Sequence, residues 1–199
     1  MSSRDRILAA AQDLFQRRGF HAVGLNDILA AAKAPKGALY HHFPAGKDEL
    51  GARAVQGIAA DVTAYITARR AEGISAADIV GDIAEMSARR MEHERFGWSP
   101  LIAAVAHQTG ADTPLLAQAL AGAYADWRGL LGEAFAAEGF VPEIAQSLAR
   151  TAIALLEGAV ILARVDGDAA ALRAVRGQVA RLVALEARRT VDAVFAGKD

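Results

Sequence analysis

One short stretch in the first quarter of the chain carries side chains suited to binding bases and phosphates. Lys36, Tyr40 and His41 are hydrogen-bond donors, and Gly37 and Ala38 between them have almost no side-chain bulk. A helix that enters the major groove of DNA needs this combination, because small residues let its backbone approach the groove while the donors reach their partners. The stretch therefore predicts a recognition helix.

The recognition helix is the second of two short helices that a turn separates. Ile28 and Leu29 supply the apolar side of the first helix, and Leu39 and Phe43, four residues apart, supply that of the second. Pro35 stands where the second helix begins, which suits a residue without an N–H group and with φ preset near the helical value. The pattern predicts a helix-turn-helix with Leu39 and Phe43 in its core.

A longer helix precedes this motif, and its apolar side can pack behind the two short helices. Ser2 or Ser3 can cap a helix that runs to about Arg18, where Gly19 ends it. Its apolar residues recur at helical spacing along one stripe: Ile7, Leu8, Ala11, Leu14 and Phe15. We expect this stripe to cover the back of the helix-turn-helix.

The stretch GFHAVGLNDILAAAKAPKGALYHHFPAGKDEL resembles the DNA-binding signature of the TetR family of transcriptional regulators, and ILAAAQDLF before it matches that family's first helix. The resemblance rests on residues that recur at fixed spacing: Gly19, Phe20, Gly37, Tyr40, Phe43 and Lys47. It is closest to the subgroup of LmrA/YxaF-like repressors. Residues 157–168 of this chain, EGAVILARVDGD, also resemble the C-terminal region of that subgroup. Two positions depart from the family: Lys33 replaces a turn glycine, and Gly24 replaces the Thr or Ser that caps the second helix.

The resemblance implies which residues meet DNA. Lys47 would reach a phosphate from a helix N-terminus, and Asn26 with the amides near Leu25 would hold another, because a helix N-terminus favours anions. His42 is open between a packed and a DNA-contacting role. The expected DNA-binding residues are Asn26, Lys36, Gly37, Ala38, Tyr40, His41 and Lys47.

Composition and charge agree with a folded protein whose two ends differ. The 199 residues are 53% hydrophobic and 23% charged and contain no cysteine, which excludes a disulfide scaffold and thiolate chemistry. Residues 1–53 hold eight Lys/Arg against five Asp/Glu, a balance of +3, and residues 54–199 hold fourteen against eighteen, a balance of −4. The basic end carries the helix-turn-helix, as nucleic-acid binding requires.

The rest of the chain predicts helices only. We expect an all-α fold of about nine helices, with a three-helix DNA-binding domain at residues 1–46 and a ligand-binding and dimerisation domain at residues 47–199. A helix from about Lys47 to Arg70 would connect them. Neither a leader sequence nor an apolar run near eighteen residues is present, so we expect a cytoplasmic protein that does not cross a membrane.

Apolar and aromatic side chains in the second domain suggest a small-molecule pocket. Each could equally be ordinary core, but together they fit a mostly apolar effector site, which the resemblance also implies. The candidates are Met86, Met91, Phe96, Trp98, His107, Tyr124 and Trp127. His107 and Gln108 are the best polar candidates.

A further segment suggests a homodimer. Between Ala152 and Ala163 only Glu157 and Gly158 are not apolar, and such a helix is either wrapped in its own domain or pressed against a second copy. The expected interface residues are Ile153, Leu156, Val160, Ile161 and Val179. A two-fold pair of recognition helices would read an inverted repeat.

No motif points to catalysis, to a metal or to a cofactor. The sequence has no nucleophile elbow, phosphate loop, H-E-x-x-H or Glu-x-x-His pattern, and Glu92-His93-Glu94 reads as a solvated helix end. We expect a homodimeric repressor that binds a palindromic operator and is released by a small apolar effector. The alternative is a helical small-molecule-binding or sequestering protein without operator binding; an enzyme is not expected.

Overall fold

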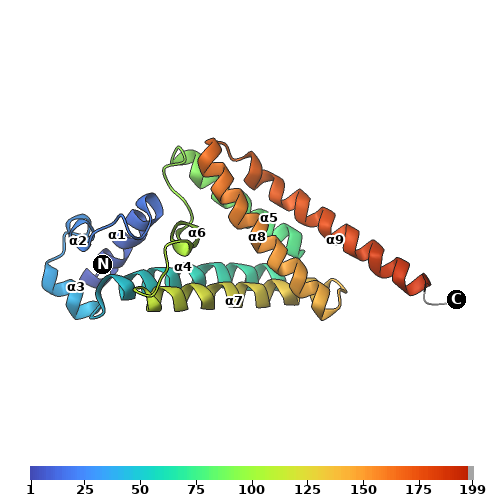
Figure 1. The fold of residues 1–199 in the computed structure, drawn as a ribbon, viewed down its shortest axis with the longest axis horizontal. Helices are drawn as coiled ribbons and strands as arrows, with labels where there is room; N and C mark the ends of the chain where they lie inside the picture. Colours follow the sequence, from blue (N-terminus) through green and yellow to red (C-terminus); the bar gives the residue numbers. More distant parts are fainter. Residues whose placement is uncertain (197–199) are drawn as a thin grey trace. The chain divides into compact units, whose positions relative to one another are not determined.

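The computed structural model describes residues 1–196, and its regular structure is helical (Figure 1). Within this part of the chain there are nine helices and no strand, which confirms the predicted all-α fold. The helices are α1 (Ser3–Arg18), α2 (Leu25–Ala32), α3 (Lys36–His42), α4 (Gly46–Ala71), α5 (Ala76–His93), α6 (Leu101–Ala106), α7 (Pro114–Ala137), α8 (Pro142–Asp166) and α9 (Ala170–Ala196).

Two helix ends have local causes. The helix α5 ends at His93, because Arg95 and Phe96 adopt φ values of 49° and 59° that no right-handed helix contains. The short helix α6 stops at Ala106, two residues before Gln108, whose side chain packs elsewhere in the first unit.

The described chain divides into two compact units. One consists of residues 1–62 and 97–125, and the other of residues 63–96 together with the chain from 126 onward. Two of the three boundaries fall inside helices, in α4 and in α7, and the third falls in the connection between α5 and α6. Among the described residues, no helix has both the length and the apolarity that crossing a lipid bilayer would require.

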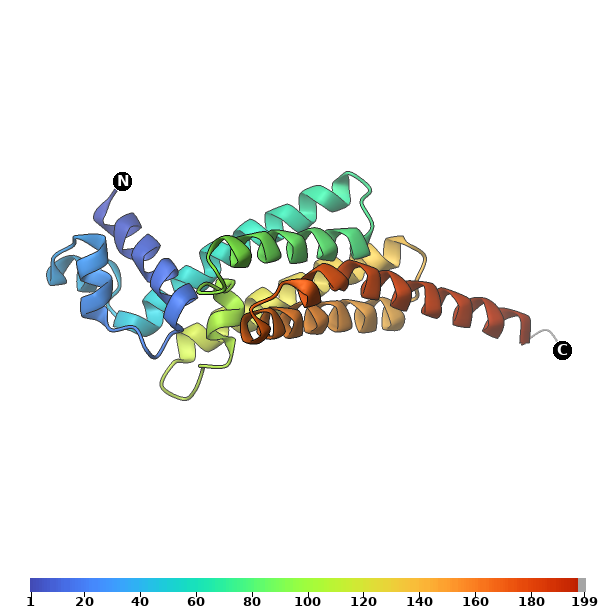
Figure 2. The ribbon, with the colours of Figure 1, turned by 90° about the horizontal axis from the view of Figure 1, so that it is seen from above.

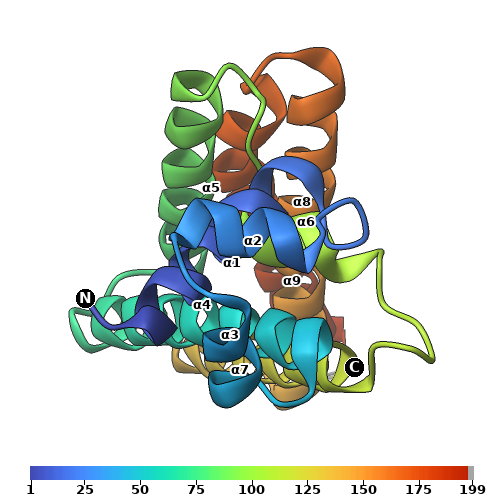
Figure 3. The ribbon, with the colours of Figure 1, turned by 90° about the vertical axis from the view of Figure 1, so that its left-hand side faces the viewer.

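The first unit contains the predicted helix-turn-helix, α2 and α3, resting on α1 (Figure 3). The cap of α1 lies where the sequence predicted it: Ser2 Oγ accepts from the Asp5 amide, and Asp5 Oδ2 accepts from the Ser2 amide, both at 3.1 Å. This reciprocal pair satisfies two amide groups that the first turn leaves unpaired. Gly19 ends the helix with φ of 76°, as expected for a residue without Cβ.

Phe20, directly after α1, packs on the backbone of α4. Its ring lies 5.2 Å from that of Phe15, centroid to centroid, and reaches Gly51. A Cβ atom added to Gly51 would lie 2.7 Å from Phe20 Cε2, closer than real side chains approach. The ring therefore comes this close to α4 only because residue 51 is glycine.

In the second unit, α9 packs along both α5 and α8 (Figure 2). The Arg176 side chain lies across Gly81 of α5 and forks to Asp78 and Asp82, with both N···O distances at 2.6 Å. The hydrogen bond from Ser75, followed by that from Arg176, holds the pKa of the Asp78 carboxyl below its ordinary value. The pair of bonds fixes the position of α9 along α5, because Arg matches two acceptors in a rigid fork.

We predict that Gly51→Ala, unlike Gly57→Ala, does not stabilise the protein. The added methyl group must displace Phe20, at a cost of about 1–3 kcal/mol, which offsets or exceeds a helix-propensity gain of about 1 kcal/mol. Gly57 provides the control in the same helix, because a Cβ there meets only Gln12 Nε2 at an ordinary 3.5 Å. Urea unfolding should show Gly57→Ala stabilised and Gly51→Ala not; equal stabilisation of both would contradict the close packing.

Candidate nucleic-acid interface

The recognition helix α3 separates core from surface as predicted. Leu39 and Phe43 are buried, which confirms their core assignment. The expected DNA-contacting residues on this helix are on its open side: Lys36, Gly37, Tyr40 and His41 are exposed, and Ala38 is half-buried. Pro35 is the N-cap, one position earlier than predicted, with an extended ψ of 152°.

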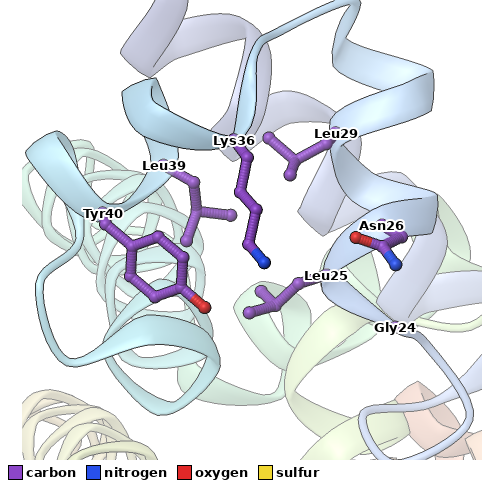
Figure 4. A pocket seen from close by; sticks show the side chains of 7 residues that line it. All are labelled: Gly24, Leu25, Asn26, Leu29, Lys36, Leu39 and Tyr40. Carbon is purple, nitrogen blue, oxygen red and sulfur yellow. The ribbon is translucent and has the colours of Figure 1, made fainter.

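A small hollow between α2 and α3 brings several predicted residues together. It holds about 160 Å³ and is lined by Gly24, Leu25, Asn26, Leu29, Lys36, Leu39 and Tyr40. The Lys36 ammonium and the Tyr40 hydroxyl point into it, and Asn26 lies across from them on α2 (Figure 4). The hollow thus combines a cation, a hydroxyl and an amide side chain next to a helix N-terminus, a set that suits a phosphate or a base edge.

The two departures from the family pattern are accommodated locally. Gly24 has no side chain with which to cap α2, but Asp27 Oδ2 accepts from the Gly24 amide at 3.2 Å, so half of the reciprocal cap remains. Lys33 adopts the left-handed conformation, with φ 47° and ψ 49°, at the turn where the family has glycine. This conformation costs a residue with a Cβ atom about 1 kcal/mol or more.

Lys47 lies beside the core of the first unit. Its ammonium is 4.5 Å from the centroid of the Phe20 ring and 3.4 Å from the His21 carbonyl oxygen. Burial lowers the pKa of Lys47 below its ordinary value of 10.5. The side chain therefore has a structural partner in Phe20, and its phosphate contact stays a prediction.

Two residues of α1–α3 take roles that sequence reasoning did not assign. His42 Nε2 lies 2.9 Å from Ser3 Oγ, so it joins the end of α3 to the start of α1. Arg6 Nε donates to the Ala32 carbonyl oxygen at 3.1 Å and satisfies the last carbonyl group of α2. Periodicity could not reveal either contact, because each joins residues far apart in sequence.

The expected effector residues divide between the two units. Trp98, His107 and Tyr124 belong to the first unit, whereas Met86, Met91, Phe96 and Trp127 belong to the second. Met91 is fully buried, and Met86 is 50% exposed. In the part of the chain described, no three His, Asp or Glu side chains gather as a metal site would need.

The expected dimer residues lie in the second unit and differ in exposure. Val160 and Val179 are 4% and 1% exposed and belong to the unit's own core, while Ile161 is 45% exposed. Ile153 and Leu156 are half-buried. One side of α8 therefore packs within the chain, while Ile161, Leu162 and Val165 on its other side are exposed to solvent.

These features define a helical protein with a helix-turn-helix at its N-terminal end, and comparison with known proteins identifies the family. Residues 7–54 match the sequence profile of bacterial regulatory proteins of the tetR family, and residues 76–178 match the C-terminal domain of LmrA/YxaF-like transcriptional regulators. The chain belongs to the TetR family of transcriptional regulators, in the LmrA/YxaF-like group. This membership also confirms that it is a regulator and not an enzyme.

Relatives match over most of their length. The chain is 32% identical to an HTH-type transcriptional regulator of Mycobacterium tuberculosis over 92% of this chain and 95% of that protein. It is 31% identical to the HTH-type transcriptional regulator LmrA of Bacillus subtilis, over 80% of this chain and 85% of LmrA. A TetR transcriptional regulator from Legionella pneumophila has the same fold, with a TM-score of 0.79 at 22% identity, covering 91% of this chain and 97% of that one.

We predict that replacing both Lys36 and Tyr40 by Ala weakens binding to a specific DNA site and changes which sequences are preferred. Each base contact that is lost should cost about 1–3 kcal/mol. Selection from randomised duplexes and fluorescence anisotropy measure the two effects. Arg89→Ala, which removes an exposed cation from α5, is the control and should change neither. Unchanged affinity and preference in the double variant would show that α3 is not the recognition helix.

Proposed function

We propose that the protein is a transcriptional repressor that binds a palindromic operator as a homodimer and leaves it when a small, largely apolar effector binds. The observation that carries the DNA-binding part is the open face of α3, where Lys36 and Tyr40 meet Asn26 across the hollow. Small residues beside them, Gly37 and Ala38, leave room for the groove.

The proposed contacts fall into two kinds. Tyr40 and His41 lie on the exposed side of α3, where hydrogen bonds to base edges would carry sequence information. Asn26 and the amides at the start of α2 would bind a phosphate, and Lys47 a second one. Phosphate contacts position the protein without specifying sequence, so their loss should weaken binding to all sequences alike.

The outward side of α8 supports the homodimer. Ile161, Leu162 and Val165 lie within two turns and are 45%, 52% and 77% exposed. Neighbouring apolar side chains left open to water indicate an interaction surface, and a two-fold pair would cover the same patch on both copies. Two recognition helices related by that axis require an operator with inverted half-sites.

We predict that Leu162→Asp separates the dimer and lowers operator affinity. A carboxylate buried in the interface lacks a partner, a cost of several kcal/mol, and a single recognition helix reads only one half-site. Sedimentation gives the oligomeric state, and anisotropy compares an inverted repeat with a single half-site. Met86→Asp, at a similarly exposed apolar position on α5, is the control and should remain dimeric. A folded monomer in the unmodified protein would contradict the proposal.

The effector part of the proposal predicts a fluorescence signal. Both tryptophans of the chain, Trp98 and Trp127, are candidate effector residues and each unit holds one of them, so an apolar ligand bound beside either should change intrinsic emission. A ligand that favours the DNA-free conformation must bind more weakly in the presence of operator, by about 5- to 150-fold for typical couplings. Titration of small apolar compounds with and without operator measures this ratio.

The same titration distinguishes the proposed repressor from the alternative function. A small-molecule-binding or sequestering protein would bind its ligand equally well with and without the duplex and would not bind operator. A ratio of one would therefore exclude effector-controlled repression.

A further inference from the structure

Two side chains outside α1–α3, those of Asp48 and Gln108, bind backbone amides of the first unit. The amides lie at the start of α7 and in the corner between α1 and α2. Asp48, in the first turn of α4, accepts hydrogen bonds from the amides of Leu115 and Leu116 at the start of α7, at 3.0 and 2.9 Å. Gln108, just after α6, accepts from the His21 amide in the corner between α1 and α2, at 2.9 Å. All of these residues belong to the same compact unit.

Asp48 replaces the cap that α7 would otherwise have from its own sequence. Thr113 directly precedes the helix and is the residue type expected to bind the amides of its first turn. Its hydroxyl is engaged elsewhere: it accepts from the Gly110 amide at 2.8 Å and donates to the Gly110 carbonyl oxygen at 3.2 Å. The two amides of α7 are therefore satisfied by a carboxylate whose charge also suits a helix N-terminus.

Gln108 fits into the corner because residue 19 is glycine. A Cβ atom at Gly19 would lie 2.3 Å from Gln108 Nε2. The same amide group donates to the Ala104 carbonyl oxygen at 3.0 Å, so the side chain is held in the orientation that presents its oxygen to His21. Gly19 thus serves both the positive φ at the end of α1 and the close approach of Gln108.

Two further contacts also connect α1 and α4 to the segment that contains α6 and the start of α7. The Ser99 amide donates to the Gln16 carbonyl oxygen near the end of α1, at 3.0 Å. A Cβ atom on Gly51 would have Leu116 Cδ1 3.5 Å away, so the residue whose amide Asp48 binds also packs against α4. The segment from Ser99 to Leu116 therefore holds both the α1–α2 corner and the beginning of α4.

We propose that Asp48 and Gln108 are positioning residues for DNA binding: they fasten the helix-turn-helix and the start of α4 to α6 and α7, and so present α3 in one orientation. This inference rests on the proposed operator binding. When the hydrogen bonds of Asp48 or those of Gln108 are lost, α3 is correctly oriented in only a fraction of the molecules. The apparent affinity for DNA is then reduced in proportion to that fraction. Loss of a helix-cap interaction corresponds to a shift of about 3- to 30-fold.

The test compares variants that differ in whether residue 48 or residue 108 can still accept these hydrogen bonds. Asp48→Ala and Asp48→Asn remove the same charge, but asparagine retains an oxygen that can accept from the α7 amides. We expect Asp48→Ala to bind operator about 3- to 30-fold more weakly than Asp48→Asn. Gln108→Met keeps the shape and loses the bond to His21, and Gln118→Met, at an exposed position on α7, is its matched control.

Two further readouts separate positioning from general damage. The dependence of affinity on salt should keep its slope in Gln108→Met, because the bound form still makes every phosphate contact. Hydrogen exchange at the His21 amide should accelerate in Gln108→Met, while exchange at Phe15 within α1 stays unchanged. Thermal melting shows whether each variant is folded, and the glutamine pair provides the test should Asp48→Ala not fold.

The outcomes are distinguishable. If unmodified protein binds no operator, the proposed function fails, and the positioning role fails with it. If unmodified protein binds and both Asp48→Ala and Gln108→Met are folded and bind with unchanged affinity, the positioning role alone is overturned. Weaker binding with an unchanged salt slope, rescue by Asp48→Asn and faster exchange at His21 would establish it.

Discussion

The packing of the Phe20 ring on the backbone of α4 determines how the first unit is built. The ring meets Phe15 of α1 on one side and Gly51 on another, and the Lys47 ammonium lies over it. Because Gly51 presents no side chain, the ring can approach the helix axis of α4 more closely than usual side-chain packing allows. Because α2 begins at Leu25, the contact anchors the chain close to the start of the helix-turn-helix.

Local sequence signals predicted local structure well. The donors and small residues of α3, the Ser2 cap and the glycine at the end of α1 all act within a few residues, where spacing determines geometry. The open side of α3 could therefore be read from the sequence, as could the burial of Leu39 and Phe43. The substitution of Lys33 for a turn glycine is likewise a local signal, because the turn demands a left-handed backbone conformation at that position.

Contacts between distant residues could not be predicted in the same way. Asp48 and Leu116 are 68 positions apart, and His21 and Gln108 are 87 apart, so no periodic pattern links them. Gln108 was considered as a possible effector contact, because a polar residue at the end of an apolar helix gives no sign of its partner. The helix α8 shows the other limit: a segment that is apolar on all sides does not reveal which side faces inward, and Val160 proved to be core while Leu162 is open.

The discontinuous first unit has a consequence for the way such regulators can be recombined. The helices that carry the DNA-binding surface share their compact unit with residues 97–125, although α5 of the other unit lies between them in sequence. An exchange of N-terminal segments between two family members at the end of α4 would pair one parent's Asp48 and Gly19 with the other parent's α6 and α7. A working chimera must therefore transfer residues 99–116 together with α1 to α4, through three crossover points.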